Sequence, residues 1–489
     1  MENASVGRIK KIGTIQTIAE MSVPAENARE ILSMQPSAYV RVSETLTGEV
    51  RLSGRETLTV VYLSDDGAKS EVCSVDFTAR AEIDGVTPSQ KVYAMGKVFD
   101  TEVVSMGGGI VKLASVIEIT IYAEEKCELP ELPTADNGVF VCDEAETYSN
   151  LVAVVHDKST HTTERITGGE FLCAEARTCI KGCDAILDGV EIYGNIIVEG
   201  LQKGAEGNLS PFSVTLPLSE ELQAEGARRG DKVKIEISSI SVSEEENEDG
   251  FILNIVLSYF GCVYSDVTLS CVSDAYSPES ELELELNKKL ITGDRITDCQ
   301  HFTEQINETV TLGEGENADR VLAVTGVDLT SLTAREENGK AVIEGVIIAN
   351  VIYSDVEADK KKATLINLPF GFTSSVELSA NDQIDVYGRV GNISVRPSRV
   401  GELSVKAELH MHTVKSHAVE MTAVIGYKQG AERNKKEGVI SMRVGRENET
   451  LWEVAKSLLV SPNEIVRQNP DVTFPLKKGD KIFVFRAKV

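Results

Sequence analysis

Apolar and polar residues alternate along most of the chain with a period of two. Residues 110–123 (IVKLASVIEITIYA), 251–261 (FILNIVLSYFG) and 402–412 (ELSVKAELHMH) show this alternation clearly. The segments are rich in Val, Ile, Thr and Tyr and are bounded by Gly, Asp and Asn. That combination is typical of half-buried antiparallel strands, and few stretches before the C-terminal region have a helical period. The pattern predicts a mainly β protein.

The alternating segments recur as copies of one longer unit. Gly54 and Tyr62 match Gly345 and Tyr353, and both pairs are separated by 291 residues, so the register holds without a gap. A weaker middle copy places Gly194 where the other copies have their matched glycine. A strand containing Phe and two further alternating strands follow in each copy. The matched segments are residues 48–66, 190–201 and 339–357. Similarity of this kind indicates tandem domains built from one unit.

The predicted fold is therefore three tandem antiparallel β-sandwich or barrel-like repeats followed by a small βααβ domain. The expected domains are residues 1–135, 136–285, 286–430 and 438–489. Two segments predict linkers: the acidic residues 124–137, which include two prolines, and the charged run 429–438. Residues 277–289 (SPESELELELNKK) fit either a further linker or a solvated strand.

The C-terminal region carries two helix-start signals. Thr450 and Glu453 have the spacing of a capping box, in which each side chain accepts a hydrogen bond from the other residue's amide. Ser461 and Glu464 have the same spacing, and Pro462 stands at the first helical position. A strand-like segment precedes the first helix and another follows the second, so the order β-α-α-β is expected within about fifty residues.

This region resembles a LysM domain over its whole length. The usual Gly-Asp before the Thr-Leu of that family is replaced here by Asn448-Glu449. In LysM domains two loops form a glycan groove, and they correspond to residues 445–450 and 470–475. Trp452, the only tryptophan, fits either a core position or a binding position. The matching residues are Val444, Thr450, Leu451, Trp452, Ala455, Val460, Ser461, Ile465, Asn469, Pro470, Gly479, Asp480, Lys481 and Ile482.

The candidate binding residues lie on these two loops and on the basic surface beside them. They are Arg446, Asn448, Glu449, Thr450, Trp452, Asn469, Pro470, Asp471, Lys477, Lys478 and Lys481.

Repeated β units followed by one C-terminal LysM-like module resemble the SPOCS-domain spore-coat morphogenetic proteins of the SipL type. That resemblance implies a non-catalytic scaffold or adaptor in spore coat assembly, located in the mother-cell cytoplasm at the forespore surface. It also implies that the module binds a coat-basement ATPase of the SpoIVA type, with other coat proteins as further candidate partners. The alternative is a cell-wall protein whose LysM module binds peptidoglycan or another glycan that contains N-acetylglucosamine.

Charge and cysteine usage bear on these alternatives. The formal net charge is −28, which argues against binding to nucleic acid or to an anionic membrane. From residue 433 onwards, however, 12 Lys/Arg face 7 Asp/Glu, whereas the rest of the chain has 37 against 70. This split serves either solubility or attraction of an acidic partner to the tail. Nine cysteines without a CxxC pair indicate reduced thiols. The N-terminal residues have no signal-peptide pattern and no apolar run is long enough to span a membrane, so a cytoplasmic protein without membrane insertion is expected.

No motif for catalysis stands out. The chain has no P-loop, no HExxH and no GxSxG motif, so no enzymatic activity and no cofactor are expected. Gly107–Gly109 predicts a hairpin turn between two strands. The acidic residues 244–249 are expected in a solvated hairpin loop, because they lack the spacing of a calcium loop.

One pair of histidines has a spacing that suits a metal ion. His410 and His412 lie on one face of a predicted strand, with His417 nearby, and could bind zinc. No cysteine or acidic residue is placed beside them by the sequence, so no metal site is predicted. Cys179 and Cys183 are interpreted as ordinary strand packing.

Overall fold

The computed structural model describes residues 5–128, 138–247, 250–286, 291–313, 315–355, 360–433 and 440–485. Antiparallel strands make up most of these residues, and the two helices have 8 and 7 residues. The prediction of a mainly β protein is thus confirmed. Neither helix of the described residues is long and apolar enough to cross a membrane.

Eighteen of the strands form three groups of six. The first contains β1 (Ser5–Pro24), β2 (Glu30–Leu46), β3 (Glu49–Ser64), β4 (Gly67–Glu82), β5 (Val92–Gly107) and β6 (Ile110–Glu128). The second contains β7 (Phe140–Thr162), β8 (Glu170–Ile186), β9 (Gly189–Lys203), β10 (Leu209–Gln223), β11 (Lys232–Asn247) and β12 (Gly250–Tyr276). The third contains β14 (Ile291–Thr311), β15 (Ala318–Glu337), β16 (Lys340–Asp355), β17 (Lys360–Glu377), β18 (Asp382–Pro397) and β19 (Glu402–Met421).

The same strand order recurs in each group. The second, third and fourth strands form one three-stranded sheet, and the first, sixth and fifth strands form another in that order. Alternate residues of each strand point into a core between the two sheets, as Ile343, Ile347 and Val351 of β16 do. Each such side chain contributes about 1.5–3 kcal/mol by leaving water, so the alternation in the sequence is what fixes the inward face of each strand.

A glycine beneath an aromatic ring recurs across the sheets. A Cβ atom on Gly54 would lie 2.4 Å from the Phe77 ring, so only glycine allows the ring to lie across this strand. Gly194 holds the sixth position of β9, as the alignment predicts, but Phe212 faces Gly200 instead. The three pairs are Gly54–Phe77, Gly200–Phe212 and Gly345–Phe370.

Several local expectations can be compared with the strands. The predicted turn is confirmed, because β5 ends at Gly107 and β6 begins at Ile110, and Gly108 and Gly109 have φ values of 62° and 79°. The loop predicted at residues 244–249 is wrong in part, because β11 continues to Asn247 and only residues 248–249 lie outside the described residues. The acidic residues 244–246 do not interrupt β11. Their side chains are exposed to solvent, while their backbone pairs with β12.

The predicted linkers are also shorter than expected. Residues 124–128 belong to β6 and pair with β1, while 129–137 lie outside the described residues. Residues 280–286 form β13 (Ser280–Leu286), which pairs with β20 (Val424–Glu432). Strand β20 therefore takes up the start of the linker predicted at residues 429–438, of which 434–438 lie outside the described residues. A charged segment can remain a strand when it pairs with a neighbour in an exposed two-stranded sheet.

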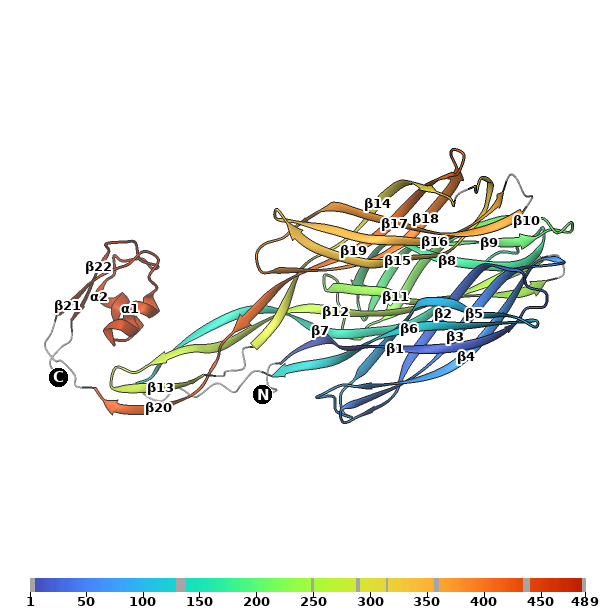
Figure 1. Cartoon of the computed structure of the whole chain (residues 1–489). Helices are drawn as coiled ribbons and strands as arrows, with labels where there is room; N and C mark the ends of the chain where they lie inside the picture. The colour runs from blue at the N-terminus through green and yellow to red at the C-terminus, as the bar shows by residue number, and fades with distance from the viewer. Residues whose placement is uncertain are drawn as a thin grey trace.

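The three groups of strands lie side by side in one body, and the long strands β7 and β12 continue beyond it (Figure 1). These two strands remain paired from Asn254–Thr162 to Tyr276–Phe140, and we call the part beyond the body, residues 140–150 with 265–276, the ribbon. A small module with both helices lies near the far end of the ribbon.

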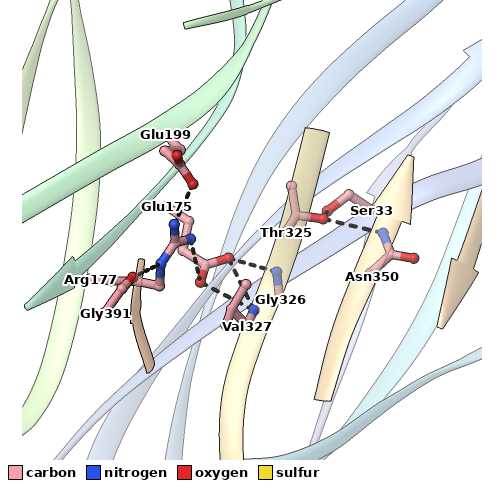
Figure 2. A network of polar contacts seen from close by, with 9 residues as sticks. All are labelled: Ser33, Glu175, Arg177, Glu199, Thr325, Gly326, Val327, Asn350 and Gly391. Carbon is pink, nitrogen blue, oxygen red and sulfur yellow. Dashed lines mark hydrogen bonds and ion pairs between the residues drawn. The ribbon is translucent and has the colours of Figure 1, made fainter. Parts of the chain in front are cut away.

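Buried polar contacts join the first group to the third. The hydroxyl oxygens of Ser33 on β2 and Thr325 on β15 are 2.8 Å apart, and both residues are almost fully buried. The Asn350 amide donates to the Thr325 hydroxyl (Figure 2). It also donates to the Leu32 carbonyl at 2.7 Å. Buried polar groups are costly unless paired, so these contacts favour one relative position of the two groups.

A buried charged pair joins the second group to the third. Glu175 on β8 accepts hydrogen bonds from the backbone amides of Gly326, at 2.6 Å, and Val327, at 3.1 Å (Figure 2). Arg177, on the same strand, donates to the carbonyl of Gly391 at 2.9 Å. Burial raises the pKa of Glu175, while Arg177 and the two amides act in the opposite direction. These contacts fix how the second and third groups meet.

Candidate functional site: the C-terminal module

The C-terminal module consists of two strands and two short helices. Strand β21 (Ile440–Val444) pairs with β22 (Lys481–Phe485) in an antiparallel register that places residue 440 opposite 485. Helices α1 (Leu451–Leu458) and α2 (Pro462–Gln468) lie between them in the chain. The order β-α-α-β is the one expected from the sequence.

One of the two predicted capping boxes is present. Thr450 caps α1: its hydroxyl accepts from the Glu453 amide, and the Glu453 carboxylate accepts from the Thr450 amide. The second predicted box is wrong, because the Ser461 side chain makes no cap hydrogen bond and Glu464 instead accepts hydrogen bonds from Arg467 and Gln468. Pro462 does stand at the start of α2, so its fixed φ is enough to begin that helix.

Glu449, a predicted binding residue, points into the module. It is only 8% exposed, its carboxylate pairs with Arg443, and it also accepts from the Arg446 amide at 3.0 Å. Its backbone carbonyl accepts from the Leu476 amide at 2.8 Å, and the Asn448 amide donates to the Leu476 carbonyl at 2.9 Å. The carboxylate therefore holds the 445–450 loop beside residues 476–480, and its oxygen atoms are occupied within the protein.

Asn469, a second predicted binding residue, is also used internally. Its side-chain amide donates to the carbonyls of Ile465 and Phe483, and its side-chain oxygen accepts from the Phe483 amide at 2.7 Å. This arrangement ties the end of α2 to β22. Asn469 is the asparagine of the Asn-Pro pair that resembles LysM domains, and its hydrogen bonds to Ile465 and Phe483 give this asparagine a structural role.

The other predicted binding residues on the loops are exposed. Asn448 has a φ of 60°, in the left-handed region that Asn tolerates well. The backbone amide of Lys477 donates to Asp480, which closes the turn that presents the lysines. The exposed set is Arg446, Asn448, Thr450, Pro470, Asp471, Lys477, Lys478 and Lys481.

Trp452 lies at the contact between the module and the ribbon. Its indole Nε1 donates to Asp274 at 2.9 Å, and its ring packs against Tyr276 with centroids 4.9 Å apart. The Lys456 ammonium group also reaches Asp274, at 2.6 Å, and the Tyr276 hydroxyl donates to the Val460 carbonyl at 2.6 Å. Trp452 is thus half-buried, and it contacts the ribbon as well as the module's own core.

The outer face of the β21/β22 sheet is apolar and exposed, and sequence reasoning missed this feature. The inner positions Ile482 and Val484 are fully buried, whereas the alternate positions on both strands face solvent. The sequence did contain a signal for it. An amphipathic strand should carry polar residues on its outer side, whereas β21 carries Ile440, Met442 and Val444 there. We call this surface the outer apolar face; it consists of Ile440, Met442, Val444, Phe483 and Phe485, which are 39–65% exposed.

Two clusters of potential metal ligands lie in the body, and they correct the interpretation of the histidine pair. Strand β8 brings Cys183 beside His412 and His301, and brings Cys179 beside His410 and Glu408. The expectation that no cysteine or acidic partner stands near these histidines was wrong. The two cysteines come from β8, more than 200 residues before His410 and His412, which spacing along one strand cannot reveal. Glu408, in contrast, stands only two residues before His410 on the same strand.

Comparison with known proteins gives no further guide, because no family model, no curated protein and no solved structure matches this chain.

Proposed function

We propose that this protein is a non-catalytic scaffold that binds another protein through the outer apolar face of its C-terminal module. The observation that carries the proposal is this face, with five large apolar side chains on paired exposed strands. Contiguous exposed apolar surface on a protein of this kind marks an interaction site more often than chance. Strand β21 also lies at an edge of this two-stranded sheet, which offers backbone hydrogen bonds to a partner strand, whereas the edge of β22 is occupied by Gln468 and Asn469.

The resemblance to SPOCS-domain and LysM proteins supplies the biological setting. Three groups with one strand order are what tandem copies of a SPOCS-like unit would give, and the βααβ order suits a LysM-like module. On this basis the partner is a coat-basement ATPase of the SpoIVA type, and the setting is spore coat assembly in the mother-cell cytoplasm. Other coat proteins are further candidates.

Charge supports an acidic partner surface. Lys477, Lys478 and Lys481 are exposed, and Lys481 lies directly opposite Val444 at the end of the outer apolar face. Apolar contacts would supply most of the affinity, while the lysines would increase the association rate and make it depend on salt.

A glycan is the second candidate ligand. The first of the two loops that would form a sugar groove is hydrogen-bonded to Leu476, the residue that follows the second loop, and Asn448 and Asp471 are exposed on these loops. Three observations favour the protein partner instead. Glu449 and Asn469 have their side-chain oxygens occupied, and the Trp452 ring contacts Tyr276 rather than a free surface on which a sugar could stack.

The test is a binding measurement on the full chain with a purified ATPase of the SpoIVA type. Replacing Met442 and Phe483 with Lys should weaken binding at least tenfold, because both central side chains of the face are lost. The matched control is Val400→Lys, which changes an apolar residue that is 85% exposed in the body. Equal affinity of all variants would exclude the outer apolar face.

Chitin oligomers provide the test of the alternative. The result that favours a glycan ligand over a protein partner is saturable binding at micromolar concentrations that changes Trp452 fluorescence. This binding should be unaffected when Met442 and Phe483 are replaced with Lys.

A further inference from the structure

Three side chains from three strands meet where the second group of strands contacts the third. They are Cys183 on β8, His301 on β14 and His412 on β19, and their candidate ligand atoms all lie within 4.8 Å of one another. The Cys183 Sγ is 3.2 Å from His301 Nε2. His301 and His412 stand directly opposite each other on paired strands, with their rings stacked at 4.0 Å.

These separations are close to what a tetrahedral ion requires. With metal bonds of about 2.3 Å to sulfur and about 2.0–2.1 Å to nitrogen, the sulfur and a nitrogen stand about 3.6 Å apart, and two nitrogens about 3.3 Å. The observed 3.2 Å between Cys183 and His301 is near the first value. Small rotations of the side chains would bring all three donors to one point.

His412 provides an independent indication of a ligand. It is only 6% exposed. Its ring lies near the Ile235 backbone, but within the described residues neither ring nitrogen has a hydrogen-bond partner of ordinary geometry. A buried polar group left without a partner costs about 1–3 kcal/mol, so packing alone does not explain why a histidine stands here. A hydrogen bond between Cys183 and His301 accounts for that contact but not for the two ring nitrogens of His412.

Protonation is compatible with metal binding. Burial lowers the pKa of His412 to about 3, with His301 acting in the same direction, and burial also lowers the pKa of His301. Both rings are therefore neutral at physiological pH, which is the form that binds metals. Burial raises the pKa of the Cys183 thiol to about 12, so binding of an ion would release its proton.

We propose that Cys183, His301 and His412 bind a divalent transition-metal ion of the zinc class, and that this ion joins the second group of strands to the third. One thiolate and two imidazoles are the ligands that zinc prefers. A water molecule would complete the coordination, because Cys299, two residues before His301 on β14, is not part of the cluster.

The neighbouring cluster of Cys179, Glu408 and His410 is the weaker candidate. The His410 Nε2 is already 2.7 Å from the Glu408 carboxylate, so its hydrogen bonding is satisfied without an ion. A Cβ atom on Gly391 would lie 2.7 Å from the Cys179 sulfur, so the backbone of β18 closely covers this cluster.

The experiment uses untagged full-length protein from which metals have been removed, with Co²⁺ as the spectroscopic probe. We expect one Co²⁺ per chain, a thiolate-to-cobalt charge-transfer band, tetrahedral visible bands, and displacement by Zn²⁺. Zinc should raise the Tm by several degrees, because it binds the folded chain. Cys183→Ser should abolish the charge-transfer band, and His412→Ala should weaken Co²⁺ binding at least tenfold.

The controls separate this site from non-specific binding and misfolding. Cys73→Ser and His417→Ala change residues outside both clusters, and both should retain the wild-type cobalt spectrum. Absence of a thiolate–cobalt band in the wild-type chain, which requires no variant to fold, would overturn the proposal. A band that survives Cys183→Ser and disappears in Cys179→Ser would overturn it too, by placing the ion in the neighbouring cluster.

Discussion

Removing the Asp274 carboxylate should loosen the C-terminal module from the ribbon. This side chain accepts from the Trp452 indole at 2.9 Å and from the Lys456 ammonium group at 2.6 Å. Both donors belong to α1, so one carboxylate on β12 holds one helix of the module. Asp274→Ala deletes both contacts while leaving the Tyr276–Trp452 ring contact in place.

The expected loss follows from the exposure of each partner. A hydrogen bond to a charged group contributes about 1.5–3 kcal/mol. The Lys456 side chain is 44% exposed, so water screens its ion pair and it adds about 0.2–1 kcal/mol. A total of about 2 kcal/mol corresponds to roughly a thirtyfold decrease in the ratio of docked to undocked module. Tyr276→Phe, which removes only the hydrogen bond to the Val460 carbonyl, should cost about 1 kcal/mol, or roughly fivefold.

Trp452 is the only tryptophan, so its fluorescence reports on this contact directly. In Asp274→Ala the emission should shift to longer wavelength and acrylamide should quench it more strongly, with Tyr276→Phe giving a smaller change. Glu144→Ala, which removes an exposed carboxylate from the same ribbon, is the matched control. If Asp274→Ala and Glu144→Ala gave the same emission and quenching as the wild type, the contact would not hold the module.

Three further predictions concern stability. Glu175→Ala should lower the free energy of unfolding in urea by about 3 kcal/mol, because it leaves the backbone amides of Gly326 and Val327 without an acceptor while Arg177 keeps its ion pair with Glu199; a loss below 1 kcal/mol would contradict this. Thr450→Ala should destabilise the module by about 1 kcal/mol in a fluorescence-detected denaturation, whereas Ser461→Ala should be nearly neutral because its hydroxyl makes no cap. Hydrogen bonds from the Ser379 amide, His417 and Lys415 outweigh burial and hold the pKa of Asp382 below its ordinary value of 3.8. Its stabilisation is therefore complete above that pH and lost as the pH falls further, and Asp382→Asn should flatten the acid limb of a stability–pH curve.

The sequence predicts the strands well because each strand carries its own period-two signal. In β16 the buried positions Ile343, Ile347 and Val351 are spaced at even intervals, so local alternation is enough to identify the strand and its inward face. The match of Gly54 with Gly345 depends only on local sequence, and both glycines hold the sixth position of their strands, in groups that share one strand order. The capping signal at Thr450 is local as well, and the predicted capping box with Glu453 is present.

The sequence could not predict which residues far apart in the chain lie in contact. Asp274 binds a helix that begins nearly 180 residues later, and Cys183 meets His301 and His412 only because β8 packs against the third group of strands. Nothing in the spacing of these residues encodes their partners. Ser461 shows the converse failure, since its spacing from Glu464 suits a capping box but the carboxylate bonds to other side chains instead.

The ribbon also explains how a basic module can remain available on a strongly acidic protein. On a flexible linker, a tail with a net excess of five positive charges would be drawn to a body with an excess of 33 negative charges. Strands β7 and β12 instead keep the module at the far end of a continuous paired ribbon (Figure 1). The ribbon is itself held by its neighbours, because Asn150 accepts from the Gly7 amide and Ser149 accepts from the Ile296 amide. Since Gly7 belongs to the first group and Ile296 to the third, all three groups of strands set the direction in which the module is presented.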